Sequence, residues 1–599
     1  MRFMDATPTL NNPVLCRKSF FSTLTEALDY ASQGQTGYNF YSGAGELFAV
    51  LPYATLRKEA RSLAKKLANM GVARGSRVAL LADMHPDFVR FFFACQYAGL
   101  IPVPLPAQIQ FGGGKAYIAQ LKRLLSNCQA ELAMAPDAFL PFLTDAAAGS
   151  KLRFLGTPQD YDVLAETHTP LNPAGPTELA YLQYTSGSTR FPRGVMISQK
   201  AVLNNLLAII QEGIKVREGD RAMSWLPFFH DMGLVGLLLC PMASQISVDF
   251  LNTMDFAMRP RLWLRLMSEN RATISFSPPF GYELTARRLR DNDMQKYDLR
   301  SWRVAGVGAE MIRPESLKHF ADRLKPCGFD ERAFLPCYGM AECSLAVCFG
   351  PQGQSLQTDH VDGDLLSERQ IAVPVDPQAG NGKGRFNTFV NCGLPLSEYE
   401  LEIRNLAGRV LPERHCGTLY LRGPSVMSGY FGDPGSTRAV LSEDGWLNTG
   451  DLAYQIGTSV VITGREKDMI IIHGRNIWPQ DIECLAELQP EIGTRDALAF
   501  SVPGPDGEEQ AVVMVQCCVS DRQKSAELEE RIHRLIRDEL GIICKVALVP
   551  QDSLPRTTSG KPSRSSARKE YLRRIILDQS ANRKKERDTG VIPDTAEAL

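Results

Sequence analysis

The sequence predicts an α/β protein with two domains. A large N-terminal domain of several subdomains, with mostly parallel sheets flanked by helices, is joined by a hinge to a small α+β C-terminal domain. The 599 residues exceed what one hydrophobic core supports. Strand-like and helix-like segments alternate in the first half, which favours crossover connections and a parallel sheet. A charged link, Gly464 to Asp468, then precedes a segment in which strands surround one long helix.

The clearest elements of the first half lie between residues 53 and 103. From Tyr53 to Met70 apolar residues recur on one helical face, and Gly71 can end this helix in the left-handed conformation. An apolar strand at 78–82, a helix at 86–98 and a strand-like run at 101–103 follow. This order of strand, helix and strand predicts a crossover unit in a largely parallel sheet.

The segment after the charged link predicts a small α+β domain of about a hundred residues. Strands are expected at 497–502, 511–519 and 546–549, with a helix at 525–540 that Gly541 ends. We therefore place the N-terminal domain at 1–464, the hinge at 465–468, the small domain at 469–580 and a disordered tail at 581–599.

Bulk properties exclude several kinds of protein. The composition, with 44% apolar and 22% charged residues, is that of a globular protein. Lys and Arg number 66 against 67 Asp and Glu, so net charge gives no indication of nucleic acid or an anionic membrane as partner. The most apolar runs, 91–105 and 232–248, contain Pro and are too short for a transmembrane segment.

Cysteine usage and the N-terminal residues indicate the compartment. The fourteen Cys are scattered, without a Cys-x-x-Cys pair, which argues for reduced thiols and against a zinc site. The first residues, 1–19, lack a basic region followed by an apolar core, so we expect no secretory signal. The sequence thus predicts a cytoplasmic protein.

The stretch Tyr184 to Gly194 reads Tyr-Thr-Ser-Gly-Ser-Thr-Arg-Phe-Pro-Arg-Gly and separates two apolar runs. This is the composition of a strand, a loop and a second strand. Small residues let backbone N–H groups approach an anion, hydroxyls add donors, and Arg193 adds charge, so a polyphosphate suits it. A solvated Ser- and Gly-rich turn explains the composition equally well, and the Gly-Lys-Ser/Thr of a P-loop is missing.

Two further segments suit an acyl substrate. His230 lies between bulky apolar residues and beside Asp231, where it could hold a carboxylate or gate a pocket, although such a His is more often a hydrogen-bonded core residue. The run Ser275 to Phe280 looks like a strand end that turns at two prolines and lines an apolar cavity. Core packing explains this run equally well.

Two Gly-containing segments suit a purine nucleotide. The run Gly306 to Glu310 permits close backbone approach, as a base edge needs. In Tyr338 to Glu342 a ring is available for stacking, and Glu342 could hold Mg²⁺. Each is weak alone, because Tyr-Gly is a common turn at a strand end.

Three later segments complete the pattern. Asp451 follows a turn, and its carboxylate could accept hydrogen bonds from the two hydroxyls of a ribose. An Asp whose side chain hydrogen-bonds to the backbone of its own turn is the more common case. Lys561 ends an exposed loop from which it could reach an anionic site, although most exposed Lys are merely solvated. Between Pro351 and Asn391 the composition shifts to Gln, Asp, Gly and Pro, which indicates an ordered insertion or a flexible loop.

In their order these motifs are far more specific than any one of them. Tyr-Thr-Ser-Gly-Ser-Thr, Tyr-Gly-Met-Ala-Glu, Thr-Gly-Asp, Gly-Arg-x-Lys-Asp and Thr-Ser-Gly-Lys resemble the adenylate-forming superfamily of acyl-CoA synthetases, peptide-synthetase adenylation domains and luciferases. The resemblance runs from about Tyr53 to Arg564. Within it the chain looks most like the fatty acyl-AMP ligases, on segments 183–189, 226–234 and 336–342 and the extra segment after Glu342.

This resemblance implies that a fatty acid reacts with ATP, in the presence of Mg²⁺, to give acyl-AMP and pyrophosphate. It also implies a role for each matching residue. These roles are phosphate binding for Thr185, Ser186, Gly187, Ser188, Thr189 and Arg193; adenine binding for Gly308, Ala309, Glu310, Tyr338, Gly339 and Met340; ribose binding for Asp451 and Arg465; acyl binding for Phe276, Ser277, Pro278, Phe280 and His230; Mg²⁺ binding for Glu342; a hinge at Asp468; and catalysis by Lys561 and His230.

Three positions depart from the pattern of the superfamily. Arg193 replaces a common Lys, so the charge is kept but a planar fork replaces a compact ammonium. Arg190 stands where many members have Gly, which the acyl-AMP ligases also tend to lack. Ile471 stands where CoA-forming relatives often carry Lys. With the 351–391 insertion, this change favours an acyl carrier protein as acceptor in place of CoA.

Two alternatives to an acyl-AMP ligase remain open from the sequence. A medium- or long-chain acyl-CoA synthetase would share the ATP residues, whereas a non-catalytic acyl-nucleotide-binding module would have little use for Lys561 and Glu342. The basic cluster 564–587 could dock an acidic carrier protein, although a solvated basic helix is the more common case.

Overall fold

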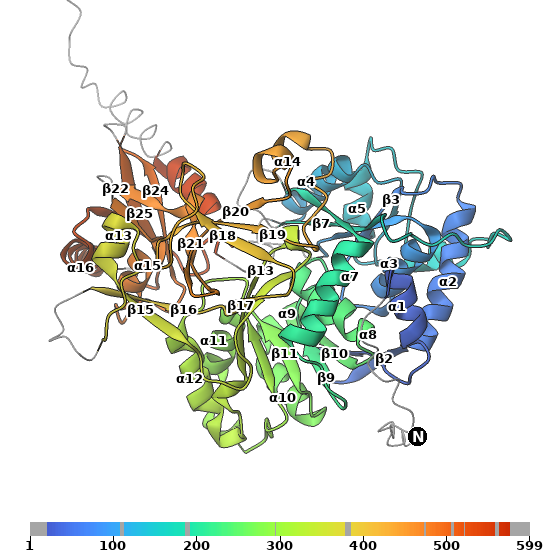
Figure 1. The fold of residues 1–599 in the computed structure, drawn as a ribbon, viewed down its shortest axis with the longest axis horizontal. Coiled ribbons are helices and arrows are strands. Elements are labelled where there is room, and N and C mark those ends of the chain that lie inside the picture. The colour runs from blue at the N-terminus through green and yellow to red at the C-terminus, as the bar shows by residue number, and fades with distance from the viewer. Residues whose placement is uncertain are drawn as a thin grey trace, which may run out of the picture.

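The computed structural model describes residues 21–107, 113–185, 192–293, 295–377, 385–472, 475–504, 508–519, 521–556 and 562–575. In Figure 1 the chain runs from the blue elements on the right, through the green and yellow centre, to a small orange and red unit at the upper left. The predicted fold class is confirmed: mostly parallel sheets flanked by helices make up the larger part of the chain, and a smaller α+β unit follows.

The largest sheet has nine strands in the order β17-β14-β13-β12-β11-β9-β10-β1-β2. Its inner pairs are parallel, and antiparallel strands close both ends. Its strands are β1 (Gly37–Tyr41), β2 (Leu47–Pro52), β9 (Arg221–Ser224), β10 (Ser247–Leu251), β11 (Ile274–Ser277), β12 (Val304–Val307), β13 (Phe334–Gly339), β14 (Ala346–Phe349) and β17 (Leu394–Pro395).

The predicted crossover unit is confirmed in a second, parallel sheet of order β4-β3-β5-β6. Helix α3 (Pro86–Ala98) connects β3 (Arg77–Leu81) to β4 (Ile101–Leu105), and Gly99 ends the helix at φ +67°. The other strands are β5 (Leu132–Met134) and β6 (Phe154–Gly156). The predicted helix before this unit is α2 (Tyr53–Asn69), which is followed by Gly71 at φ +69°.

Helices pack their apolar faces against these sheets in one extensive core and in a second cluster on the other face of the four-stranded parallel sheet. Where Ser, Thr, Asn or Asp precedes a helix, its side chain commonly accepts from the first turn, as Ser198 does before α7. The remaining helices are α1 (Leu24–Ala31), α4 (Gly113–Cys128), α5 (Leu140–Ala147), α6 (Pro158–Asp162), α7 (Gln199–Ala208), α8 (Cys240–Ala243), α9 (Thr253–Met258), α10 (Arg261–Glu269), α11 (Pro279–Arg288), α12 (Pro314–Leu324) and α14 (Pro434–Val440), with π-helical turns at Ile209–Gly213 and Met232–Leu239.

A four-stranded antiparallel sheet leads toward the small unit. Its strands are β18 (Glu400–Arg404), β19 (Gly417–Arg422), β20 (Leu447–Ile456) and β21 (Ser459–Arg465). Asp451 lies within β20 and not after a turn, because Gly450 at φ +69° kinks the strand without ending it. The kink still leaves the Asp451 carboxylate at a cavity wall.

The described part of the 351–391 segment is ordered. Strands β15 (Thr358–Asp362) and β16 (Phe386–Val390) pair antiparallel, and α13 (Gly363–Arg369) follows β15. Figure 1 shows this segment beneath and beside the small unit. Of the two predictions for this segment, an ordered insertion is therefore correct for the described residues.

The small unit has a core separate from that of the large sheets. Helix α16 begins after Asp521, whose side chain accepts from Lys524, and ends at Gly541 in the left-handed conformation, as predicted. Its other elements are β22 (Ile470–Ile472), β23 (Arg475–Ile477), α15 (Pro479–Glu487), β24 (Ala497–Pro503), β25 (Glu509–Gln516) and β26 (Cys544–Val549), with α16 at Arg522–Leu540.

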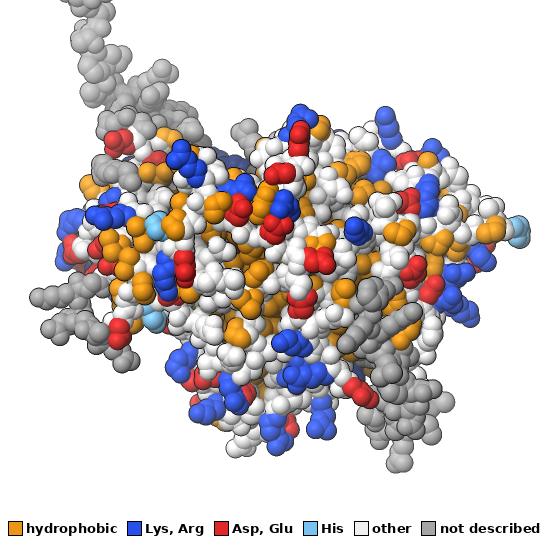
Figure 2. All heavy atoms as spheres, viewed as in Figure 1, with side chains coloured by type: hydrophobic (Ala, Val, Ile, Leu, Met, Phe, Trp, Pro, Cys, Tyr) orange, Lys and Arg blue, Asp and Glu red, His pale blue; other side chains and the backbone are white. Residues whose placement is uncertain are grey.

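The surface and the cysteines fit the sequence-based expectations. Figure 2 shows Lys and Arg interspersed with Asp and Glu over the visible face. The cysteines in the described ranges are free thiols. Among the described residues, no helix combines the length and apolar character that a bilayer crossing needs.

Candidate active site

The predicted anion loop begins and ends at a β-hairpin. Strand β7 (Leu179–Tyr184) pairs antiparallel with β8 (Gly194–Ser198), so Thr185 and Arg193 meet at the same end, where the Thr185 N–H donates to the Arg193 carbonyl at 3.1 Å. Both residues line a cleft of about 610 Å³. Ser186, Gly187, Ser188 and Thr189, with Arg190, lie outside the described residues, so their contact with phosphate stays a prediction.

A chain of polar contacts crosses this cleft from Arg193 to Glu342. The Arg193 guanidinium lies 5.0 Å from the centre of the Tyr430 ring, and the Tyr430 hydroxyl donates to Glu342 Oε1 at 2.9 Å. Burial raises the pKa of the Glu342 carboxyl above its ordinary value of 4.5. His230 and Asp231 line the same cleft, at the start of the π-helical turn Met232–Leu239.

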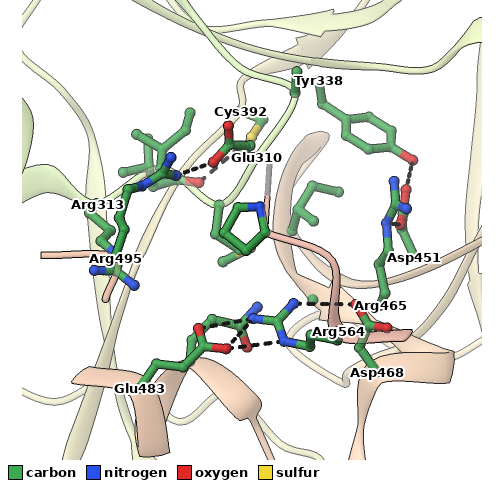
Figure 3. Close-up of a pocket in the computed structure, with 18 of the residues that line it drawn as sticks. Glu310, Arg313, Tyr338, Cys392, Asp451, Arg465, Asp468, Glu483, Arg495 and Arg564 are labelled. Atoms are coloured by element: carbon green, nitrogen blue, oxygen red, sulfur yellow. Dashed lines mark hydrogen bonds and ion pairs between the residues drawn. The ribbon is translucent and has the colours of Figure 1, made fainter. Parts of the chain in front are cut away.

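The residues predicted to bind ribose lie together. Tyr338 donates its hydroxyl to Asp451 Oδ2 at 2.7 Å, and Arg465 Nε is 3.1 Å from Asp451 Oδ1. Figure 3 shows Asp451 between these two side chains. Asp451 is buried, and its charge raises the pKa of Arg465. The carboxylate is therefore fixed in position by two donors on different elements, β13 and β21.

The segments predicted to bind adenine line a second cavity, of about 230 Å³, between the large part of the chain and the small unit. Ala309, Glu310, Tyr338 and Gly339 contribute to its wall. Met340 instead lines the phosphate cleft.

Gly308 and Gly339 have a packing role that the sequence did not reveal. A Cβ at Gly308 would lie 2.5 Å from the Cys337 carbonyl oxygen, and one at Gly339 would collide with the Leu345 carbonyl. Their lack of a side chain thus serves contact between neighbouring strands.

Glu310 has a partner that sequence reasoning missed. Its carboxylate forms an ion pair with Arg495 of the small unit, and Arg495 Nε also lies 3.0 Å from Glu283 Oε2 on α11. The exposed fractions of these side chains are only 13% for Arg495, 12% for Glu283 and 10% for Glu310. No local pattern marks Arg495, because its partners are distant in sequence.

The predicted acyl residues separate in the structure. Phe276 lines an apolar cavity of about 90 Å³ together with Met232, Gly236, Phe349 and other residues. In contrast, Ser277, Pro278 and Phe280 are not in its wall. Ser277 donates to the Pro278 carbonyl at 2.7 Å, and Phe280 packs edge-on against Trp225 at 5.6 Å and beneath Arg495.

The predicted hinge residue contacts the small unit. Asp468 Oδ2 is 3.3 Å from Arg564, which also binds Glu483 on α15 at 2.8 Å. Figure 3 shows this cluster at the edge of the second cavity, below the Asp451 group. A further pair, Arg313 with Glu487 at 2.6 Å, also connects the two parts of the chain. Lys561 lies outside the described residues.

A comparison with protein families assigns the chain to one family. The profile of the AMP-binding enzyme family matches residues 47–431. The chain belongs to this family. It is an adenylate-forming ligase that uses ATP, and among the relatives of this ligase are fatty acyl-AMP ligases.

Three relatives cover nearly all of this adenylate-forming ligase. A Caulobacter vibrioides protein with the provisional name acyl-CoA synthetase is 44% identical over 94% of this chain and 98% of its own. The medium-chain-fatty-acid–[acyl-carrier-protein] ligase JamA of Moorena producens is 32% identical over 93% and 96%. A structure from a study of fatty acyl-adenylate ligases of E. coli and L. pneumophila has TM-score 0.89 and 45% identity, over 94% of this chain and 100% of the solved one.

Proposed function

We propose that this ligase is a fatty acyl-AMP ligase. A fatty carboxylate oxygen attacks the α-phosphorus of ATP, the bond from that phosphorus to the bridging oxygen breaks, and acyl-AMP and pyrophosphate form. The observation that carries this proposal is that a polar cleft and an apolar cavity share a wall residue, Asp231. An acyl chain in the cavity would present its carboxylate beside His230 and Asp231, next to the phosphates.

The chain's own residues divide the work of binding and orientation. Thr185 and Arg193 at the hairpin, with 186–189, hold the β and γ phosphates, and Asp451 with Arg465 holds the ribose. Tyr338, Gly339 and Ala309 form the wall on which adenine packs. Lys561 binds both the attacking carboxylate and the α-phosphate, and so offsets the repulsion between two anions.

Mg²⁺ fits this arrangement through Glu342. Within the described ranges no cluster of three or more His, Cys, Asp or Glu could hold a metal ion by itself. Mg²⁺ is commonly held by one or two carboxylates with substrate phosphates supplying further oxygens. Glu342 lines the phosphate cleft, so one protein carboxylate and the ATP phosphates satisfy this pattern. The ion would offset phosphate charge when bound.

A pH dependence of ATP binding follows from Glu342. Because burial raises the pKa of this carboxyl, its negative charge is lost at a higher pH than in an exposed Glu as the solution is acidified. We expect the affinity for Mg²⁺·ATP, measured by calorimetry, to fall as the solution is acidified, and this fall should begin at a higher pH than a Glu with the ordinary pKa of 4.5 would give. Glu342→Gln should bind weakly at every pH. A variant with the same pH profile as the parent would exclude this role.

We propose an acyl carrier protein, with its phosphopantetheine thiol, as acceptor in preference to CoA. The support is the contact between the insertion and the small unit: Arg385 and Asn387 bind Asp481 at 2.6 and 2.7 Å, and Ser367 donates to the Asn476 carbonyl at 2.6 Å. Trp478 is buried in the same cluster as insertion side chains. Rotation of the small unit about Asp468 would break these contacts, so the contacts oppose that rotation. We infer that this restriction disfavours CoA as the acyl acceptor.

The domain boundaries proposed from the sequence are supported by the separate cores. We propose a hinge at 465–468 between an N-terminal domain at 1–464, with its insertion at 351–391, and a small domain at 469–580. The tail 581–599 lies outside the described residues. Reduced cysteines support a cytosolic location.

One experiment tests the proposed function. A panel of fatty acids is incubated with ATP, and acyl-AMP is measured by mass spectrometry, followed by products with CoA or with a phosphopantetheine-bearing carrier protein. We expect acyl-AMP with one range of chain lengths and transfer to the carrier protein. Rapid formation of acyl-CoA by the intact chain would instead assign an acyl-CoA synthetase, and absence of acyl-AMP would contradict the proposal.

A further inference from the structure

Lys467 lies on the short 3₁₀ turn Glu466–Asp468, at the hinge between the two proposed domains. Its side chain lines the phosphate cleft together with Thr185 and Arg193 of the large domain. Within the part of the chain that the structure describes, its ammonium has no hydrogen bond or ion pair. The predicted roles of the motif around it, Gly464 to Asp468, use Arg465 and Asp468 but not this Lys.

The carboxylates near Lys467 already have partners. Asp451 binds Tyr338 and Arg465, Glu342 accepts from Tyr430, and Asp468 binds Arg564. The pKa of Lys467 is lowered, mainly by burial and then by the charge of Arg465. The Lys467 side chain is exposed on the cleft wall, and the carboxylates that act on it electrostatically are bound to other donors. Its ammonium is therefore available to an anion that enters the cleft.

The anion of matching chemistry is a polyphosphate. The cleft already presents Arg193 from the large domain, and Lys467 brings a second cation to it from the hinge. An ammonium binds phosphate as a compact point charge with three donors, which does not require the planar geometry of a guanidinium. Lys467 can therefore bind a phosphate oxygen of ATP that the guanidinium of Arg193 does not contact.

We propose that Lys467 is a positioning residue that binds the triphosphate of ATP during adenylate formation. This inference rests on the proposed function. The contact belongs to the first half-reaction only. Once pyrophosphate has formed and left, the ammonium has no phosphate to bind in the cleft, and the second half-reaction proceeds without it.

The test compares Lys467→Gln and Lys467→Arg with a matched control, Lys545→Gln, which removes an exposed Lys from β26 of the small domain. Lys467→Gln should lower kcat/KM for ATP in pyrophosphate exchange about 10- to 100-fold, the size of a lost hydrogen bond to a charged group. Lys467→Arg should recover most of this loss, and Lys545→Gln should match the parent.

Two readouts separate this role from a structural one. Calorimetry should show that Lys467→Gln weakens binding of a non-hydrolysable ATP analogue but not of AMP, which lacks the β and γ phosphates. Transfer of preformed acyl-AMP to the acceptor should keep the parent rate. Equal losses for AMP and the analogue, or an unchanged kcat/KM, would overturn the inference. If the parent itself makes no acyl-AMP, the proposed function fails, whereas a loss of analogue binding alone would still support Lys467.

Discussion

Replacement of Lys561 by Ala will lower the rate of acyl-AMP formation about 10²- to 10³-fold, the usual effect of removing a group that stabilises charge in a transition state. The carboxylate and the α-phosphate are both anionic, so their approach is opposed unless a cation lies between them. Lys561 ends the Thr-Thr-Ser-Gly-Lys run that precedes Arg564, and Arg564 is bound to the hinge residue Asp468 at 3.3 Å.

The measurement for Lys561→Ala is pyrophosphate exchange with a saturating fatty acid, together with the affinity for ATP. Because Lys561 acts on the reacting groups, kcat should fall far more than the affinity for ATP changes. Lys569→Ala, which removes an exposed Lys from the following segment, is the control and should retain the parent rate. Exchange that survives Lys561→Ala unchanged would exclude this mechanism and favour a binding module.

Asp481→Ala will increase acyl-CoA formation about tenfold or more relative to the intact chain. Asp481 accepts from Arg385 and Asn387 of the insertion, and the exposed fractions of the paired side chains are only 12% for Arg385 and 16% for Asp481. Removal of Asp481 leaves the buried Arg385 guanidinium with only the longer ion pair to the exposed Asp364, at 3.7 Å. The loss is part of the about 3–5 kcal/mol that breaking a buried ion pair typically costs. The arrangement in which the small domain is docked on the insertion becomes less stable by that free energy, so rotation of the small domain becomes easier.

The same release can be produced from the other side of the contact. Arg385→Ala should raise acyl-CoA formation as Asp481→Ala does, and the double variant should add little, because the two residues form one interaction. Glu368→Ala is the control, since Glu368 is exposed and lies 4.0 Å from Arg475. Adenylate formation should stay near the parent rate in all of them. If neither variant, nor deletion of 351–391, raises acyl-CoA formation, the insertion does not select the acceptor.

The sequence predicted the parts of this fold that depend on local order. The helices at 53–70 and 525–540 and the crossover unit follow from apolar periodicity and from Gly at helix ends, which act over a few residues. The two strands that flank the anion loop follow from composition, whereas their antiparallel pairing was not predicted. The 351–391 segment was less clear, because its strands pair with each other across the intervening helix and have little apolar alternation.

The sequence predicted the motifs of the candidate site, but it did not predict which residues of different motifs contact one another. Tyr338, Asp451 and Arg465 were singled out one by one, and the structure brings them within hydrogen-bonding distance. Arg495 was missed, because an Arg in a loop of the small domain carries no sign of partners 185 residues away in the chain. Phe280 was placed in the acyl tunnel, but a ring beside two prolines can pack against any apolar neighbour, and here that neighbour is Trp225.

The ion pair between Glu310 and Arg495 has a thermodynamic consequence. Glu310 belongs to the loop at the proposed adenine cavity, and Arg495 belongs to the small domain, so one contact joins base recognition to the position of a whole domain. Coupling of this kind is reciprocal: an acceptor that draws the small domain away must weaken nucleotide affinity by the same factor by which nucleotide opposes that movement. Delivery of the acyl group and discharge of AMP would then be a single linked event.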